Sequence, residues 1–245
     1  MFSIFKRRTQ SPQPLFFNTD IHCHVIPGID DGAPDLETGA ELVERMSALG
    51  FKRIFASPHI TMTTFENTPE TIAEPFSRLK EAVASRGTDV ELHHWAENRI
   101  DDLMYRNLEE NRMLTIPGNR VLIENSFMQE PWNLEKLVFD IQVKGLTPIM
   151  AHPERYTYYH GHRDHLAKLV DAGLALQVNM LSLAGYYGAN EKKAAESLID
   201  AGLVRYLGTD IHRFAHIESI EQYLASKDYT RHRAALENRI LNDRI

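Results

Sequence analysis

Residue types that bind metal ions follow several apolar, β-prone segments of this 245-residue sequence. The first such segment carries Asp20, His22 and His24 at alternate positions, so a strand would turn all three side chains to one face. Spacings of 37, 38, 27 and 28 residues, each about one β–α unit, separate in turn His22, His59, Glu97, Glu124 and His152. The last such segment leads into Asp210-Ile-His212.

These residues are expected to meet in one pocket, because the carboxyl ends of parallel strands in a barrel converge on a single rim. Imidazoles combined with carboxylates suit zinc, manganese or iron. A single zinc ion seldom takes more than about four or five ligands. The set therefore predicts two or three metal ions.

Each residue also has an ordinary structural explanation. A single histidine after a strand is more often a satisfied core or loop residue than a ligand, and Asp31 could simply cap the helix that follows it. Glu97 and Glu124 are harder to explain in this way, because a carboxylate after an apolar run needs a partner or a cation. Metal binding is favoured because the ordinary explanation would have to hold separately at five strand ends.

The hydrophobic pattern alternates short β-prone runs with longer helical ones, which indicates β–α–β units around a parallel sheet. Without a linker or composition shift, seven such units predict one α/β domain over residues 18–245, a closed or nearly closed barrel behind an amino-terminal arm of residues 1–17. The expected strands are 16–24, 53–57, 90–96, 121–123, 148–151, 174–178 and 204–207. The expected helices are 34–49, 69–85, 101–111, 132–144, 162–172, 190–201 and 217–242.

Composition narrows the class of protein. Lysine and arginine number 27 against 34 acidic residues, and the net charge of −7 argues against nucleic-acid binding. The single cysteine, Cys23, excludes an internal disulfide framework and fits a reducing compartment. Because no apolar run approaches the length of a membrane span and a secretory signal is missing, the expected location is the cytoplasm, without membrane insertion.

The motifs together resemble the PHP superfamily over roughly residues 18–213, and in particular its capsular and exopolysaccharide phosphotyrosine-phosphatase branch, the CpsB/CapC type. Branch-like stretches are His24-x-x-Pro-Gly-Ile-Asp-Asp-Gly32, Ala151-His-Pro-Glu-Arg155, Gln177-Val-Asn179 and Ser182-Leu-x-Gly-Tyr-Tyr-Gly188. The resemblance implies a distorted seven-unit (β/α) TIM-like barrel that holds three metals, commonly manganese, with iron or zinc as alternatives. Asn98-Arg99 departs from the pattern, since the family usually has an apolar residue just after Glu97.

The resemblance also implies a role for each site residue. Arg155 would meet the substrate phosphate, and Asp20 would orient a ligand histidine without binding metal itself. Glu97 would bridge the first metal to a second. The implied ligands are His22, His24, Glu97 and Asp210 for the first metal, Glu97, Glu124 and His152 for the second, and Asp31, His59 and His212 for the third.

The implied activity is manganese-dependent hydrolysis of phosphotyrosine in proteins by a metal-activated water. The implied partner is an autophosphorylated tyrosine kinase of polysaccharide export, and oligomerisation stays open. The alternatives are a small-molecule phosphatase, such as one acting on histidinol phosphate, and a non-catalytic PHP module. A cysteine-based phosphatase is excluded, because the residue six positions after Cys23 is Ile29 and not an arginine. Cys23 is expected to point away from His22 and His24, into the core.

Overall fold

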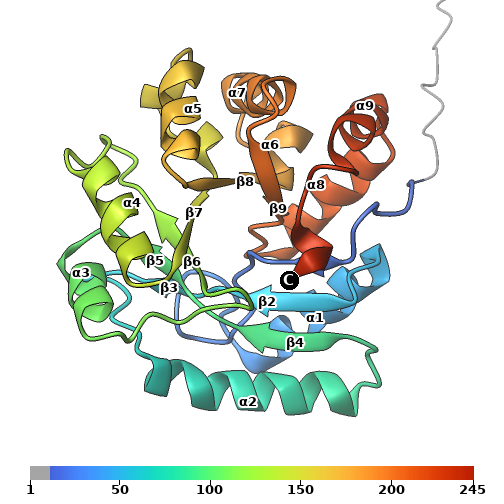
Figure 1. Cartoon of the computed structure of the whole chain (residues 1–245). Helices are drawn as coiled ribbons and strands as arrows, with labels where there is room; N and C mark the ends of the chain where they lie inside the picture. Colours follow the sequence, from blue (N-terminus) through green and yellow to red (C-terminus); the bar gives the residue numbers. More distant parts are fainter. Residues whose placement is uncertain (1–11) are drawn as a thin grey trace, which may run out of the picture.

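The computed structural model describes residues 12–245 and has two parallel sheets with helices packed around them (Figure 1). One sheet has the order β1-β2-β4 and the other the order β3-β5-β6-β7-β8-β9, and every strand pair is parallel. The strands are β1 (Thr19–Asp20), β2 (Arg53–Ala56), β3 (His59–Ile60), β4 (Glu91–His94), β5 (Glu97–Arg99), β6 (Arg120–Glu124), β7 (Thr147–Ala151), β8 (Ala175–Asn179) and β9 (Val204–Gly208).

The predicted α/β class with a parallel arrangement is confirmed, but the described residues form nine short strands and not seven. The expected strand 53–57 ends at Ala56, and β3 follows after Ser57 and Pro58. The expected strand 90–96 ends at His94, and β5 follows after Trp95 and Ala96. Proline has no amide hydrogen to donate to a ladder. Pairing nevertheless continues across the gaps, because Trp95 N donates to Ala56 O over 2.9 Å and Glu97 N donates to Pro58 O over 3.0 Å.

The first predicted strand, 16–24, is reduced to the two residues of β1. Its later part also pairs with the segment after β9: Cys23 bridges Ile211, His24 N donates to Ile211 O (2.8 Å) and Asp210 N donates to His22 O (2.7 Å). At the level of β1, the Asn242 side chain donates to Thr19 O and to Leu207 O, and it accepts from Leu207 N. Residues 19–24 are thus hydrogen-bonded to the β9 region at two levels.

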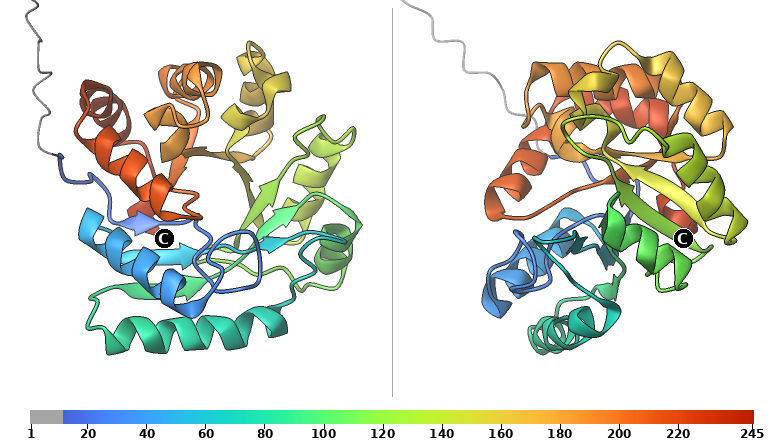
Figure 2. Two further views of the ribbon diagram at one scale, coloured as in Figure 1. Left: turned by 180° about the vertical axis from the view of Figure 1, so that it is seen from behind. Right: turned by 90° about the vertical axis from the view of Figure 1, so that its left-hand side faces the viewer.

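The helices lie outside the strands (Figure 2). They are α1 (Leu36–Leu49), α2 (Pro69–Ser85), α3 (Asp102–Glu109), α4 (Leu134–Val143), α5 (Arg163–Asp171), α6 (Met180–Ala184), α7 (Ala189–Asp200), α8 (Phe214–Leu224) and α9 (Lys227–Leu236), with 3₁₀ turns at Pro153–Arg155, Thr157–Tyr159 and Asn242–Arg244. Side-chain caps set several starts: Asp35 accepts from Thr38 N before α1, and Thr68 accepts from Thr71 N before α2.

The stretch 217–242, predicted to be helical, is helical as far as Leu236 but is not one continuous helix. The stretch forms α8 and α9, with a break at Ala225 and Ser226. Ser226 is extended, and its hydroxyl accepts from Tyr229 N over 3.1 Å, so it begins a new helix. None of the helices within residues 12–245 is both long and apolar enough to cross a membrane.

Of the expected arm, residues 1–11 lie outside the described residues, whereas residues 12–17 run along α8 and α9. Gln13 N donates to Leu224 O over 3.0 Å, and the Tyr229 hydroxyl donates to Pro14 O over 2.8 Å. Phe17 is only 4% exposed and belongs to the main core. The part of the arm next to β1 therefore packs as part of the folded body.

Candidate metal centre

Four buried side chains from three parts of the chain meet in a group that we call the metal cluster: His22, His24, Glu97 and Asp210. His22 Nε2 lies 3.3 Å from His24 Nε2, 3.3 Å from Glu97 Oε2 and 3.5 Å from Asp210 Oδ1. His24 Nε2 lies 3.4 Å from each of the same two oxygens. Ligands about 2.0–2.2 Å from a tetrahedral ion stand about 3.3–3.6 Å apart, so five separations here match the edges of such a site.

Glu97 also faces a second group through its other oxygen. Glu97 Oε1 lies 3.0 Å from His152 Nε2, which is 3.9 Å from Glu124 Oε1. Glu97 Oε2 is fully buried and has no hydrogen-bond partner, although imidazole nitrogens lie nearby. A buried carboxylate oxygen without a donor is costly, and a cation would remove that cost.

A third group lies closer to the surface. Asp31 Oδ1 is 3.5 Å from His59 Nε2 and 3.4 Å from His212 Nε2, and the Asp31 side chain is half exposed. The rings of His212 and His24 stack at 4.0 Å, which joins this group to the metal cluster. The structure thus brings all of the sequence-predicted ligands within reach of one another in overlapping groups: His22, His24, Asp31, His59, Glu97, Glu124, His152, Asp210 and His212.

Two residues that the sequence did not single out orient the cluster histidines. Gln177 Oε1 lies 2.7 Å from His22 Nδ1, and Asp30 Oδ2 lies 2.9 Å from His24 Nδ1. Both partners leave the Nε2 atoms directed at the cluster, because an acceptor at Nδ1 places the proton there. Both lie inside motifs read from the sequence, but their roles depend on contacts that sequence spacing does not reveal.

Asp20 has a different part from the one that the resemblance implied. Its carboxylate accepts from the Thr209 hydroxyl (2.6 Å), from Thr209 N (3.0 Å) and from His22 N (3.3 Å), and it makes no hydrogen bond to an imidazole. Asp20 therefore fixes the backbone before Asp210, whereas the ring-orienting role belongs to Gln177 and Asp30.

Close backbone packing and local strain hold the ligands in place. A side chain at Gly32 would put Cβ 2.1 Å from His24 O, and one at Gly208 would put it 2.7 Å from His22 Cβ, so neither position accepts a larger residue. His152 and Asp210 both have positive φ, 34° and 53°, which is unusual for residues with a side chain. Strain of this kind concentrates at functional sites, where the surrounding structure enforces it.

The electrostatics show strong coupling among the buried groups. Burial acts against the charged form of His22, yet Glu97 and Asp210 raise its pKa to about 9. Burial and then the Glu97 charge raise the pKa of Glu124 to about 8, while burial and then Arg155 lower the pKa of His152 to about 4. Without a cation, protons on histidine and Glu124 must offset the carboxylate charge; metal ions would take over that task.

Beside the cluster is a cavity of about 300 Å³, lined by several predicted ligands and by Arg155, Phe127, Tyr186 and Tyr187. Arg155 Nη1 donates to Asp210 Oδ2 over 2.8 Å, and its guanidinium lies 4.2 Å from the Tyr187 ring and 5.0 Å from the Phe127 ring. Arg99 Nη1 donates to Glu124 Oε2 over 2.9 Å, so the departure from the family pattern places a second guanidinium next to a predicted ligand. Cys23, as predicted, is fully buried in the main core, and burial raises the pKa of its thiol.

Comparison with known proteins agrees with this geometry. The tyrosine-protein phosphatase YwqE of Bacillus subtilis is 31% identical over 194 residues, which cover 79% of this chain and 76% of YwqE. The tyrosine-protein phosphatase CpsB of Streptococcus pneumoniae is 27% identical over 199 residues, which cover 79% of this chain and 82% of CpsB.

A solved structure from work on YwqE of Bacillus subtilis and CpsB of Streptococcus pneumoniae, described there as unique metal-dependent tyrosine phosphatases, superimposes with a TM-score of 0.78. It is 28% identical, and the match covers 92% of this chain and 94% of the other. The family model described as capsular polysaccharide synthesis, CpsB/CapC, matches residues 18–234. The chain therefore belongs to the CpsB/CapC family.

Proposed function

We propose that this chain is a metal-dependent phosphatase that hydrolyses phosphotyrosine in proteins. The observation that carries the proposal is the metal cluster, in which the Nε2 atoms of His22 and His24 each lie 3.3–3.5 Å from a buried oxygen of Glu97 and of Asp210, directly beside a cavity lined by Arg155. The relatives named tyrosine-protein phosphatases give the substrate class.

The donor set fits metal ions, because the cluster holds a buried carboxylate oxygen without a hydrogen-bond donor and histidines whose Nε2 atoms converge. We propose that His22, His24, Glu97 and Asp210 hold one ion, that Glu97 bridges to a second with Glu124 and His152, and that Asp31, His59 and His212 hold a third. Manganese is the proposed metal. Mixed imidazole and carboxylate ligands also admit iron or zinc. Bound ions would supply an activated water and neutralise phosphoryl oxygens.

Arg155 is the proposed phosphate-binding residue. Its guanidinium is held between two aromatic rings and by Asp210, with about a quarter of the side chain still exposed at the cavity. A planar guanidinium can donate two parallel hydrogen bonds to phosphoryl oxygens. Because phenol has a pKa near 10, tyrosine is a tolerable leaving group without full protonation by an acid.

We further propose the remaining parts of this assignment. A single domain of residues 18–245 forms a distorted seven-unit barrel, supported by the contacts of residues 22–24 with residues 210–211. The phosphotyrosine protein is a tyrosine autokinase of capsule or exopolysaccharide synthesis, supported by the family description, and the enzyme works in the cytoplasm.

The deciding experiment compares a phosphotyrosine peptide with histidinol phosphate as substrates of the purified chain loaded with manganese. We expect turnover of the peptide, its loss with a chelator and its return with manganese. Preference for histidinol phosphate would favour a small-molecule phosphatase. Absence of turnover on both substrates, with metal bound, would favour a non-catalytic module and contradict the proposal.

A further inference from the structure

We infer that the β6–α4 loop, residues 125–133, is a docking surface for the polypeptide on either side of the substrate phosphotyrosine. This inference rests on the proposed phosphatase function and adds to it which part of the molecule receives the protein chain. It follows from the exposure of the loop side chains, from the contact between the loop and the cavity, and from the way the loop is anchored.

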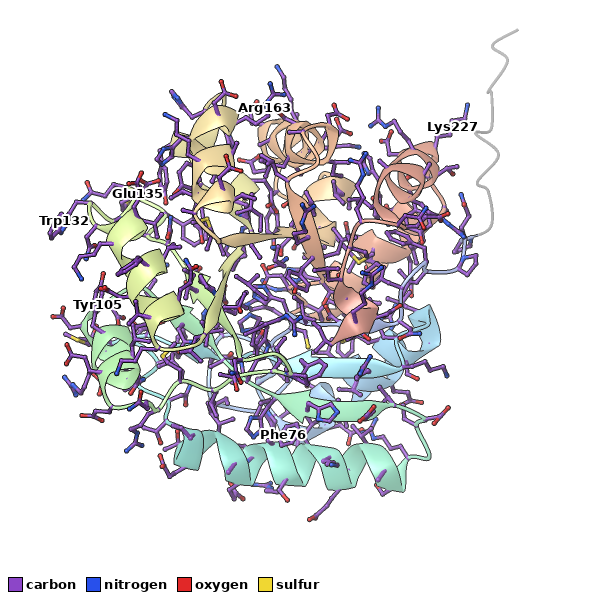
Figure 3. All side chains as sticks on the ribbon, in the orientation of Figure 1. Phe76, Tyr105, Trp132, Glu135, Arg163 and Lys227 are labelled. Carbon is purple, nitrogen blue, oxygen red and sulfur yellow. The ribbon has the colours of Figure 1, made fainter. Side chains whose placement is uncertain are left out.

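Exposed apolar side chains concentrate on one flank of the described structure. Of its seven exposed large hydrophobic residues, five fall between residues 127 and 143. Met128 and Trp132 are 88% and 95% exposed, and Trp132 projects away from the body of the molecule at the turn before α4 (Figure 3). Full exposure of tryptophan is unfavourable, and tryptophan is one of the residue types enriched at the binding hot spots of protein interfaces.

The loop is continuous with the candidate substrate cavity through Phe127. This ring is 40% exposed, lines the cavity and stacks on His152 with centroids 5.9 Å apart. The next residue, Met128, already points to solvent. A single short segment thus contributes one aromatic ring to the cavity and exposed apolar side chains to the surface outside it.

The backbone of the loop is pinned to the structure beneath it. Asn125 N donates to the Tyr156 hydroxyl over 2.9 Å, and the Tyr158 hydroxyl donates to Ser126 O over 2.8 Å. Further along, Glu130 pairs with His165 at 2.8 Å. These contacts satisfy polar groups of the loop from below, so Met128 and Trp132 are presented outward by a fixed backbone, which lowers the entropy cost of binding.

The size of the cavity decides what the loop would bind. A volume of about 300 Å³ is at the lower end for ligand pockets and suits a phosphotyrosyl side chain. The polypeptide that carries this side chain must then lie on the surface around the cavity, and the loop that places Phe127 in the cavity also carries the exposed Met128 and Trp132. We therefore expect the docked segment to carry apolar residues beside its phosphotyrosine.

The test uses the manganese-loaded full chain and three probes: p-nitrophenyl phosphate, a phosphotyrosine peptide with apolar neighbours, and the same peptide with glycine and serine as neighbours. We expect the parent chain to prefer the apolar peptide. Trp132→Ser and Met128→Ser should each lower kcat/KM for that peptide about tenfold, mainly through KM, with the rate on p-nitrophenyl phosphate unchanged. Val143→Ala, exposed at the far end of α4, is the matched control and should change neither.

Other outcomes separate the alternatives. If the parent and Trp132→Ser each had the same kcat/KM for both peptides, with normal turnover of p-nitrophenyl phosphate, the docking surface would be overturned and the phosphatase function would stand. A concentration-dependent dimer in sedimentation that Trp132→Ser abolishes, or binding to phospholipid vesicles that it abolishes, would reassign the surface to self-association or to lipid. A parent chain with bound metal and no turnover of any probe would instead refute the phosphatase function.

Discussion

Two clusters of the molecule contain histidine and glutamate, but their surroundings differ. The metal cluster lies where strands end, whereas a second group, the helix triad of Tyr223, His232 and Glu196, joins α8, α9 and α7. In the triad, the Tyr223 hydroxyl lies 2.8 Å from His232 Nδ1, and Glu196 Oε1 lies 3.2 Å from His232 Nε2. Both imidazole nitrogens of His232 are therefore satisfied by protein groups.

The difference shows that residue type alone does not identify a metal site. In the metal cluster, imidazole nitrogens of two histidines face each other and Glu97 Oε2 has no hydrogen-bond partner. In the triad, donors and acceptors alternate, and Arg231 adds a contact to Glu196. Unsatisfied, convergent ligand atoms indicate a cation site, while a chain of satisfied hydrogen bonds indicates a structural role that fixes three helices together.

The largest effect is expected from Glu97, the carboxylate that faces two ligand groups. Glu97→Ala should lower metal content and reduce turnover by about a thousandfold or more, because loss of the ions removes both the activated water and the charge neutralisation. Glu97→Gln keeps the shape of the side chain and should show the same loss if charge and bridging are what matter. Metal analysis and phosphatase assays measure both quantities.

The contrast with the triad supplies the control for this prediction. Glu196→Gln removes the carboxylate of the helix triad and should leave metal content and turnover near those of the parent. Full metal and full turnover in Glu97→Ala would show that the proposed ligand set is wrong.

A smaller loss is expected from Arg155→Lys. Lysine keeps the positive charge but cannot donate two parallel hydrogen bonds to a phosphoryl group. We expect unchanged metal content and a drop in kcat/KM of roughly 10- to 100-fold. Unchanged kinetics would mean that Arg155 serves only as the ion-pair partner of Asp210 and does not bind the phosphate.

How far the sequence predicts this molecule depends on the range of the interactions involved. The pattern of apolar runs predicted the parallel α/β class, because strand periodicity is a local property of the sequence. The residue types at the ends of these runs predicted the convergence of nine distant side chains, because parallel strands bring their carboxyl ends together. The breaks at Pro58 and Ser226 depend on local hydrogen bonding, and the pattern of apolar residues gives no information about these hydrogen bonds. Gln177 and Asp30 were missed as orienting residues, because their function exists only through three-dimensional contacts.

His232→Gln is expected to affect stability and leave activity unchanged, because the triad lies outside the metal cluster. Loss of its hydrogen bonds to the buried Tyr223 and the partly exposed Glu196 should lower the free energy of unfolding by about 1–3 kcal/mol. Urea unfolding of parent and variant measures the difference. A loss of turnover without a loss of stability would contradict the separation of the two clusters.

The pH dependence of this difference follows from the pKa of His232, which burial lowers below its usual value. The unfolded chain then binds the proton more readily than the folded chain, so the contribution of His232 to stability is present above about pH 6.5 and declines as the pH falls below it. The gap between parent and His232→Gln should therefore narrow from pH 7.5 to pH 5. A gap that widens toward acid would mean that His232 is protonated in the folded chain.

Little effect on activity is also expected at Cys23, although it lies between two residues of the metal cluster in the sequence. Cys23 is fully buried among apolar side chains, and its backbone N–H and C=O bond to Ser57, so the thiol belongs to the core and not to the cavity. Cys23→Ala should cost about 1 kcal/mol of stability through a small cavity and leave kcat nearly unchanged. Thiol alkylation should likewise spare the native enzyme, whereas a chelator should inactivate it. Loss of turnover in Cys23→Ala with full metal content would mean that the two faces of this segment are not independent, because a change in packing behind His22 and His24 would then have moved their Nε2 atoms.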